Sequence, residues 1–289
     1  MRKRVPFAAL VLCLGLAAIT QNAHAQTSGS GAIDFTARVM PSGGRPEPVR
    51  GLEFYLISKS LDDIRAEAEK SDPAPDMDHF IDTVEATPEL KDWMKKHHTV
   101  NLQGKDFTSH LTGDDIVNIP EFFDAYKTLN GGRTGGGYPQ PKYKESDKTK
   151  NPEKYKQQLD QYVDTMRRFV EKNPDSLAGL DVELAEKNPG RKWAQLITDQ
   201  KRRTEHRALQ MAQSTYLVAH TEPAADSRGS FQGLAPGNYW LTTLDTPALA
   251  GDVRLQWDVP VTVRPGETTR IELSNVNAIE PASAALTAH

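Results

Sequence analysis

The sequence predicts an α+β fold, in which a small antiparallel β-sandwich is interrupted between two strands by a long, mostly α-helical insertion. Three observations lead to this prediction. Apolar and polar residues alternate near both ends of the chain, with the period of two that half-buried strands require. Between these ends, apolar residues recur at spacings of three and four, which is typical of amphipathic helices. The middle segment, residues 61–213, also holds 28 acidic and 24 basic residues, so most of its surface must face solvent.

The first 25 residues have the charge and hydropathy pattern of a cleaved signal peptide. A positive cluster, Arg2-Lys3-Arg4, is followed by an uncharged apolar run through Ile19 and then by Ala23-His24-Ala25. This order predicts export and cleavage after Ala25. An apolar run of about 15 residues is shorter than the roughly 20 that a membrane-spanning helix needs. We therefore expect a periplasmic or secreted protein whose mature chain has no transmembrane anchor.

Removal of the signal also sets the cysteine content and the charge. Cys13 follows Leu12, where lipidation would require a small residue, so we expect it to leave with the signal. Losing the three basic signal residues changes the formal net charge from −4 to −7. An acidic chain is poorly suited to bind nucleic acid or anionic lipid, because both require an excess of Lys and Arg. The expected partner is an envelope protein or a glycan, and no oligomeric state is predicted.

The strands of the sandwich are expected in residues 26–60 and 214–277. In the first segment, apolar residues alternate from Ile33 to Val39, and a second strand is predicted at 52–57 after a turn rich in Pro and Gly. The second segment contains four further strand-like stretches, at 215–219, around Phe231, at 239–244 and at 259–273.

Six helices are expected within the insertion, residues 61–213. The clearest begins at Asn151-Pro152, where an N-cap residue precedes proline at the first helical position, and ends before Asn173-Pro174. Another begins at Asn188-Pro189 and ends in the charged stretch 201–207. The other four are expected at 61–70, 76–84, 88–97 and 120–129.

Two segments are expected to lack regular structure. Residues 131–150 are rich in Gly and Pro, then charged, and show no apolar periodicity, which predicts a disordered loop inside the insertion. Residues 278–289 are expected to form a flexible tail.

Residues 226–241 carry a distinctive motif, which reads DSRGSFQGLAPGNYWL. It resembles the central motif of carboxypeptidase regulatory-like domains, in which a D-x-x-G turn leads to an inward Phe and a Leu-x-Pro-Gly-x-Tyr-x-Leu segment. The residue types suit these positions. Asp226 and Gly229 fit a tight hairpin turn, Phe231 can enter the core, and Gly237 can take the positive φ of a type II turn.

A second stretch, residues 259–273, resembles the last hairpin of that family, with Pro265-Gly266 at its turn. The resemblance implies a small transthyretin-like (prealbumin-like) sandwich, a fold close to immunoglobulin-like sandwiches and often grouped with carbohydrate-binding modules. In the family a short turn follows the opening strand pair, whereas here the whole insertion intervenes and matches no motif.

The sequence contains no familiar catalytic or metal-binding motif. H-E-x-x-H, G-x-S-x-G and S-x-x-K are absent, and the glycine run at 131–137 lacks the Lys-Ser or Lys-Thr of a phosphate loop. His79 and Asp82 could gather with His98 or His110 on folding, although separate surface histidines are the simpler interpretation. We therefore expect no catalytic residue, no cofactor and no metal.

Trp240 and Trp257 are the candidate ligand-stacking aromatics of the sandwich. Neighbouring residues of a strand point to opposite faces, so an inward Tyr239 leaves Trp240 outward, where its indole can stack on a sugar ring. The alternative, which we favour, is that Trp240 packs beneath the helical insertion.

Three functions are consistent with these observations. The favoured one is an exported, non-enzymatic binding or scaffold protein of the cell envelope. The second is a carbohydrate-binding module, suggested by the two tryptophans and by fold analogy. The third is an enzyme with an unrecognised site in the helical insertion.

Overall fold

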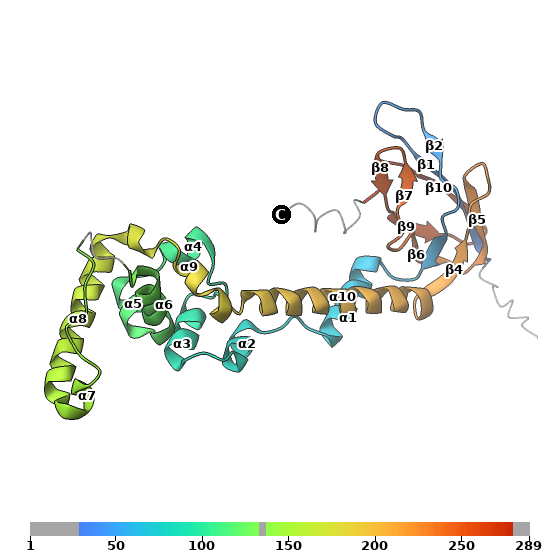
Figure 1. Cartoon of the computed structure of the whole chain (residues 1–289). Coiled ribbons are helices and arrows are strands. Elements are labelled where there is room, and N and C mark those ends of the chain that lie inside the picture. The colour runs from blue at the N-terminus through green and yellow to red at the C-terminus, as the bar shows by residue number, and fades with distance from the viewer. Residues whose placement is uncertain (1–28, 133–136, 280–289) are drawn as a thin grey trace, which may run out of the picture. The chain divides into compact units, whose positions relative to one another are not determined.

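The computed structural model describes residues 29–132 and 137–279, which belong to two compact units (Figure 1). The sandwich unit comprises Met1–Ser58 and Val218–His289, and the helical unit comprises Lys59–Leu217. Strands at both ends of the chain and helices between them confirm the predicted α+β class. The predicted signal peptide, residues 1–25, lies outside the described residues. Among the residues described, no helix is both long and apolar enough to span a bilayer.

Ten strands are present among the described residues. They are β1 (Gly31–Val39), β2 (Glu47–Pro48), β3 (Phe54–Ile57), β4 (Leu217–Thr221), β5 (Arg228–Leu234), β6 (Gly237–Thr242), β7 (Ala248–Ala250), β8 (Val253–Leu255), β9 (Asp258–Val263) and β10 (Thr268–Leu273). One sheet is built around β1, which pairs with β10 and with β2 and β5. The other has the order β4-β3-β6-β9, and β7 and β8 form a separate pair.

The sandwich is not wholly antiparallel, because β1 and β10 run parallel. The strands β9 and β10 belong to different sheets, so the turn at Pro265-Gly266 carries the chain from one sheet to the other. The prediction that β9 and β10 form a hairpin is therefore wrong. Because the chain crosses to the other sheet after β9, β10 lies alongside β1 and runs in the same direction. The pairs that β1 makes with β2 and β5, and that β6 makes with β3 and β9, are antiparallel.

Aromatic side chains fill the core of the sandwich. The ring centre of Phe35 lies 5.0 Å from that of Phe54 and 5.8 Å from that of Phe231. Tyr239 and Leu241 are also buried, which confirms the inward face predicted for β6. Burying large apolar side chains between two sheets is the main force that stabilises such a fold.

The turns of the motif differ from the predicted ones. Asp226 does support a turn, since its Oδ1 accepts a hydrogen bond from the Arg228 amide at 3.2 Å, but β4 and β5 lie in different sheets and form no hairpin. Gly229 lies within β5, where an added Cβ would stand 2.3 Å from the Phe35 ring. Its role is to leave room for that ring. The positive φ expected at Gly237 occurs instead at Gly233.

The helical unit contains short helices followed by two long ones. They are α1 (Leu61–Ser71), α2 (Met77–Thr83), α3 (Pro88–Lys96), α4 (Gly104–Ser109), α5 (Gly113–Asn118), α6 (Pro120–Asn130), α7 (Asp147–Lys150), α8 (Pro152–Lys172), α9 (Leu180–Glu183) and α10 (Gly190–Ser214), with 3₁₀ turns at Pro174–Leu177 and Ala185–Lys187. The six predicted helices are all present.

Local sequence explains both the start of α8 and the core that it covers. The Asn151 side chain accepts a hydrogen bond from the Lys154 amide, and Pro152 occupies the first helical position. The apolar stripe of α8 then buries three side chains against the other helices, namely Tyr162, Met166 and Val170. At the centre of this core, the rings of Trp93, Phe107 and Phe122 meet edge to face, with centres 5.2–5.7 Å apart.

The structure corrects the expected disorder of residues 131–150 for the part that it describes. Tyr138 packs against Tyr126 and Phe169, and residues 147–150 form α7. Tyr138 and Tyr143 therefore pack against the core of the helical unit, although the Gly, Pro and Lys content of this segment predicted no such contact. Residues 133–136 lie outside the described part.

The prediction of a flexible tail at residues 278–289 is wrong for its first two residues. Ala278 packs against the sandwich core, and the backbone of Ile279 pairs with that of Gln256. Residues 280–289 lie outside the described part.

Candidate functional site

Trp257 cannot serve as a ligand-stacking aromatic. It is fully buried, packs 6.0 Å from Phe54 and donates its indole N–H to the Ser274 carbonyl at 3.0 Å. It precedes β9 and belongs to the core, so the prediction for this residue is wrong. A Trp with a satisfied N–H between two sheets is a core residue.

Trp240 is half-buried and lies on the face of β6 opposite Tyr239. Its cross-strand neighbours are Ile57 of β3 and Pro260 of β9. Both Ile57 and Thr242, which share this face, are fully buried. The outward direction of Trp240 was predicted correctly, but its face is not an open platform for a sugar ring.

The histidines do not gather into a metal site. The described residues contain no group of three or more His, Cys, Asp or Glu side chains that could hold a metal ion. Asp82 is instead paired with Lys95, with Oδ1 and Nζ 2.6 Å apart. His97 stacks on Trp93, with ring centres 4.5 Å apart, and lies 6.5 Å from His110.

Sequence reasoning missed a cluster of Glu53, Tyr55 and His220. The carboxylate of Glu53 accepts a hydrogen bond from the Tyr55 hydroxyl and contacts Nδ1 of His220, whose ring stacks on Tyr55. The Tyr55 hydrogen bond, followed by that of His220, lowers the pKa of Glu53. Because the cluster joins β3 to β4, strands separated by the whole insertion, only knowledge of the strand order could have revealed it.

The helices α1 and α10 pack together through small side chains and polar contacts. Ala68, Ala208 and Ala212 are fully buried. The Arg65 guanidinium binds both carboxylate oxygens of Glu205, with its two closest contacts at 2.9 and 3.0 Å. Such two-point pairing fixes the helices in register, since the planar fork matches the carboxylate.

A third set of contacts ties the end of α1 to the middle of α10. The Gln200 side chain donates to the Asp72 carbonyl at 2.7 Å, and the Arg203 guanidinium binds the Asp72 carboxylate at 2.8 and 3.3 Å. The Arg203 hydrogen bonds lower the pKa of Asp72, and the charge of Arg207 lowers it further. Asp72 is thus held ionised at neutral pH.

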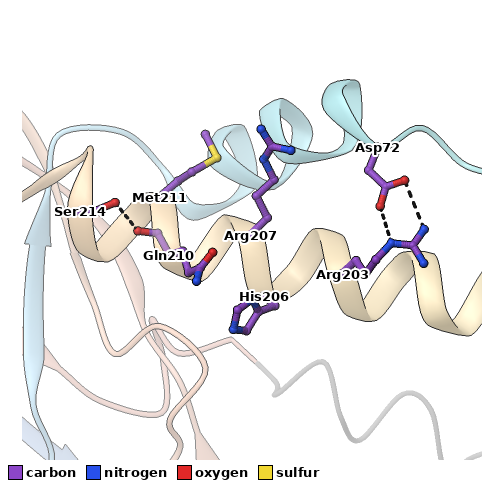
Figure 2. Close-up of a pocket in the computed structure, with 7 residues that line it drawn as sticks. All are labelled: Asp72, Arg203, His206, Arg207, Gln210, Met211 and Ser214. Atoms are coloured by element: carbon purple, nitrogen blue, oxygen red, sulfur yellow. Dashed lines mark hydrogen bonds and ion pairs between the residues drawn. The ribbon is translucent and has the colours of Figure 1, made fainter.

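Beyond these contacts, α10 presents a basic face with a shallow, open hollow. Figure 2 shows the seven residues that line it, which are Asp72, Arg203, His206, Arg207, Gln210, Met211 and Ser214. Six of them belong to α10 and follow the spacing of three and four that places residues on one helix face, and Asp72 follows the end of α1. The whole of α10 carries six basic and two acidic residues.

Four of the six basic residues of α10 form no ion pair within the described part of the chain, namely Arg191, Lys192, Lys201 and Arg207, whereas Arg202 pairs with Asp199 and Arg203 with Asp72. Of these four, Arg207 shares the helix face of Arg203 and His206. Free guanidinium and ammonium groups on an exposed helix face can bind carboxylates of another molecule. We define the basic face by Arg203, His206 and Arg207, which share one side of α10.

The comparisons with known proteins assign no family. No model of a known protein family matches the chain, and no curated protein matches it. A solved structure of the pilus backbone protein RrgB from Streptococcus pneumoniae aligns with 85% of this chain and 41% of its own length, at 10% identity and a TM-score of 0.23. This chain therefore spans less than half of that protein, and so low a TM-score carries no argument about fold or function.

Proposed function

We propose that this is an exported, non-enzymatic protein of the cell envelope that binds an acidic partner protein through the basic face of α10. The observation that carries the proposal is the charge of this helix, six basic residues against two acidic ones, in a chain of net charge −4. A local charge opposite to that of the whole chain can steer an acidic partner to one surface. On this face, Arg207 supplies a guanidinium that forms no ion pair within the described residues.

The non-enzymatic part of the proposal is supported by the state of the carboxylates. Hydrogen bonds and ion pairs lower the pKa values of Glu53, Glu67 and Asp72. A general acid that works near neutral pH needs the opposite shift, since it must hold its proton until the reaction requires it. These three groups are therefore suited to ion pairing and unsuited to act as general acids near neutral pH.

We also propose that the sandwich unit belongs with the carboxypeptidase regulatory-like domains. Support comes from the buried positions of four apolar residues of the motif, Phe231, Leu234, Tyr239 and Leu241. The parallel β1–β10 pair and the position of Gly229 within a strand are the features that a comparison with such domains must match.

The binding proposal is tested with the whole mature chain as bait in an envelope extract, followed by measurement of the affinity for the captured protein. Reversal of the free cation of this face, Arg207→Glu, should abolish capture. The matched control reverses one exposed, unpaired cation of α8, Arg168→Glu, and should leave capture intact. Affinity should fall as salt rises. Equal capture by both variants would overturn the proposal.

A further inference from the structure

Six polar side chains stand in two rows across the outer face of the sheet formed by β5, β1 and β10. In one row, strand register places Ser230 of β5, Asp34 of β1 and Arg270 of β10 side by side. The other row consists of Arg228 of β5, Thr36 of β1 and Glu272 of β10. Members of the two rows are two residues apart on each strand, which separates the rows by roughly 7 Å.

The floor between the rows is polypeptide backbone. The residues of the intervening row are Gly229, Phe35 and Ile271, of which Phe35 points into the core and Gly229 has no side chain. The resulting trough, lined by these nine residues, has a volume of about 820 Å³. That volume falls within the roughly 300–1,000 Å³ typical of small-ligand sites.

The charges of the trough are balanced, and several of its polar groups are free. Two acids, Asp34 and Glu272, face two arginines, so the site has no net charge. Within the described residues, the side chains of Asp34, Arg270 and Glu272 make no hydrogen bond or ion pair, and Arg228 contacts Asp226 alone, at 3.5 Å. The trough therefore offers unused carboxylates and a guanidinium at fixed spacing on a rigid sheet.

We propose that this trough binds a short, neutral oligosaccharide laid across the three strands. Sugar hydroxyls can donate to Asp34 and Glu272 and accept from Arg270, and hydrogen bonds to charged groups are the strong ones. A ligand of either net charge would meet repulsion from one half of the groups. An apolar ligand would find little apolar surface, because Phe35 is buried and Ile271 packs partly against the core.

An extended peptide fits this trough less well than a sugar does. A peptide that binds a sheet gains most of its affinity from unpaired backbone groups at a strand edge. The floor here is the centre of a three-stranded ladder, in which β1 already pairs with strands on both sides. Because the backbone groups of β1 are already paired, a ligand in the trough must be bound by the side chains. Carboxylate and guanidinium side chains form hydrogen bonds with the hydroxyl groups of sugars. None of the residues that line the trough is Trp240 or a neighbour of it in the sequence.

The test screens the full mature chain against a panel of neutral, acidic and basic oligosaccharides and then measures affinity for the best neutral binder by calorimetry. Asp34→Asn and Arg270→Gln should each weaken binding about tenfold or more, while Arg254→Gln, an exposed arginine outside the trough, should not. Unchanged melting temperatures show that the variants are folded. If one variant fails to fold, Glu272→Gln replaces it.

Backbone amide shifts in an NMR titration with the same sugar should be confined to residues 34–36, 228–230 and 270–272. Three outcomes would overturn the proposal. They are no binding across the neutral panel, preference for a charged glycan, and binding that survives both trough variants but is lost in Trp240→Ala. The last outcome would move the site to the other sheet.

Discussion

The core of the sandwich unit and the α1–α10 interface of the helical unit are stabilised in different ways. In the sandwich, a few large rings meet between two sheets, and β1 contacts β10 although most of the chain lies between them. In the helical unit, the interface of α1 and α10 buries alanines, and paired charges such as Arg65 and Glu205 fix its register. The stability of the sandwich core depends on how well large side chains fill it, whereas the stability of the α1–α10 interface depends on hydrogen-bond geometry.

This difference affects how each unit tolerates change. An aromatic side chain between the two sheets packs against strands of both, so its removal should destabilise the whole sandwich. An exposed charge on α10 that forms no ion pair, such as Arg207, can change with little effect on the fold. Binding surfaces can therefore be altered on α10 and on the polar face of β1 without disturbing either core.

The largest effect is expected for Trp257→Ala in the sandwich. Removing a fully buried Trp leaves a cavity and should lower the free energy of unfolding of the sandwich by about 3–5 kcal/mol. Hydrogen exchange should show lost protection in β6, β9 and β10 while α8 keeps its own. Trp240→Ala, at a half-buried position, should cost less. Equal loss of protection in both units would mean that their cores are not separate.

A smaller loss of stability is expected for Gly229→Ala. The added methyl group would stand 2.3 Å from the Phe35 ring, and such overpacking typically costs about 1–3 kcal/mol. Combining it with Phe35→Leu should recover part of this loss, which a double-mutant cycle in urea measures. Gly132→Ala, where no atom lies within 4 Å of the added group, is the control. Additive effects of the first two changes would rule out this contact as the cause.

The features that the sequence predicted are those set by local pattern. Alternation in 239–244 correctly assigned Tyr239 and Trp240 to opposite faces, and the N-cap and apolar stripe of α8 predicted its bounds closely. The presence of turns near Asp226 and Pro265 was also predictable, because turn residues act over four positions.

Features that depend on distant partners could not be predicted. The role of Gly229 depends on Phe35, and the Glu53–His220 contact depends on β3 lying beside β4 across the insertion. Trp257 was misassigned because a Trp beside a strand has the same local pattern whether it is core or surface. The charged stretch 201–207 is evident from the sequence, but which of its cations lack partners depends on the position of α1.

A still smaller effect is expected for Arg65→Met, which tests the polar interface of the helical unit. Met keeps the apolar stem but removes the two-point contact with Glu205, which should cost about 1 kcal/mol. Arg202→Met breaks an exposed pair with Asp199 and should change stability by no more than about 0.5 kcal/mol. The comparison is made by urea unfolding followed by helical circular dichroism. Equal costs would show that geometry at the α1–α10 interface adds nothing to a surface ion pair.

The smallest effect concerns a cluster that joins the first and last residues of the helical unit. The Glu67 carboxylate accepts hydrogen bonds from Lys59, at the start of the unit, and from the Tyr216 hydroxyl, near its end, the latter at 2.6 Å. The Lys59 contact, followed by that of Tyr216, lowers the pKa of Glu67. The Glu67 carboxylate in turn raises the pKa values of Lys59 and Tyr216.

These shifts predict how the stability of the helical unit depends on pH. A lowered carboxyl pKa gives stability that is present above the ordinary value of 4.5 and is lost as pH falls through the lowered pKa. The raised pKa values of Lys59 and Tyr216 give stability that is lost as pH rises through them, above 10. Glu67→Gln should flatten both limbs in a series of thermal melts across pH. Glu69→Gln, an exposed acid on the same helix, should leave both limbs in place, and a Glu67→Gln profile identical to that of the parent would show that the cluster does not stabilise the unit.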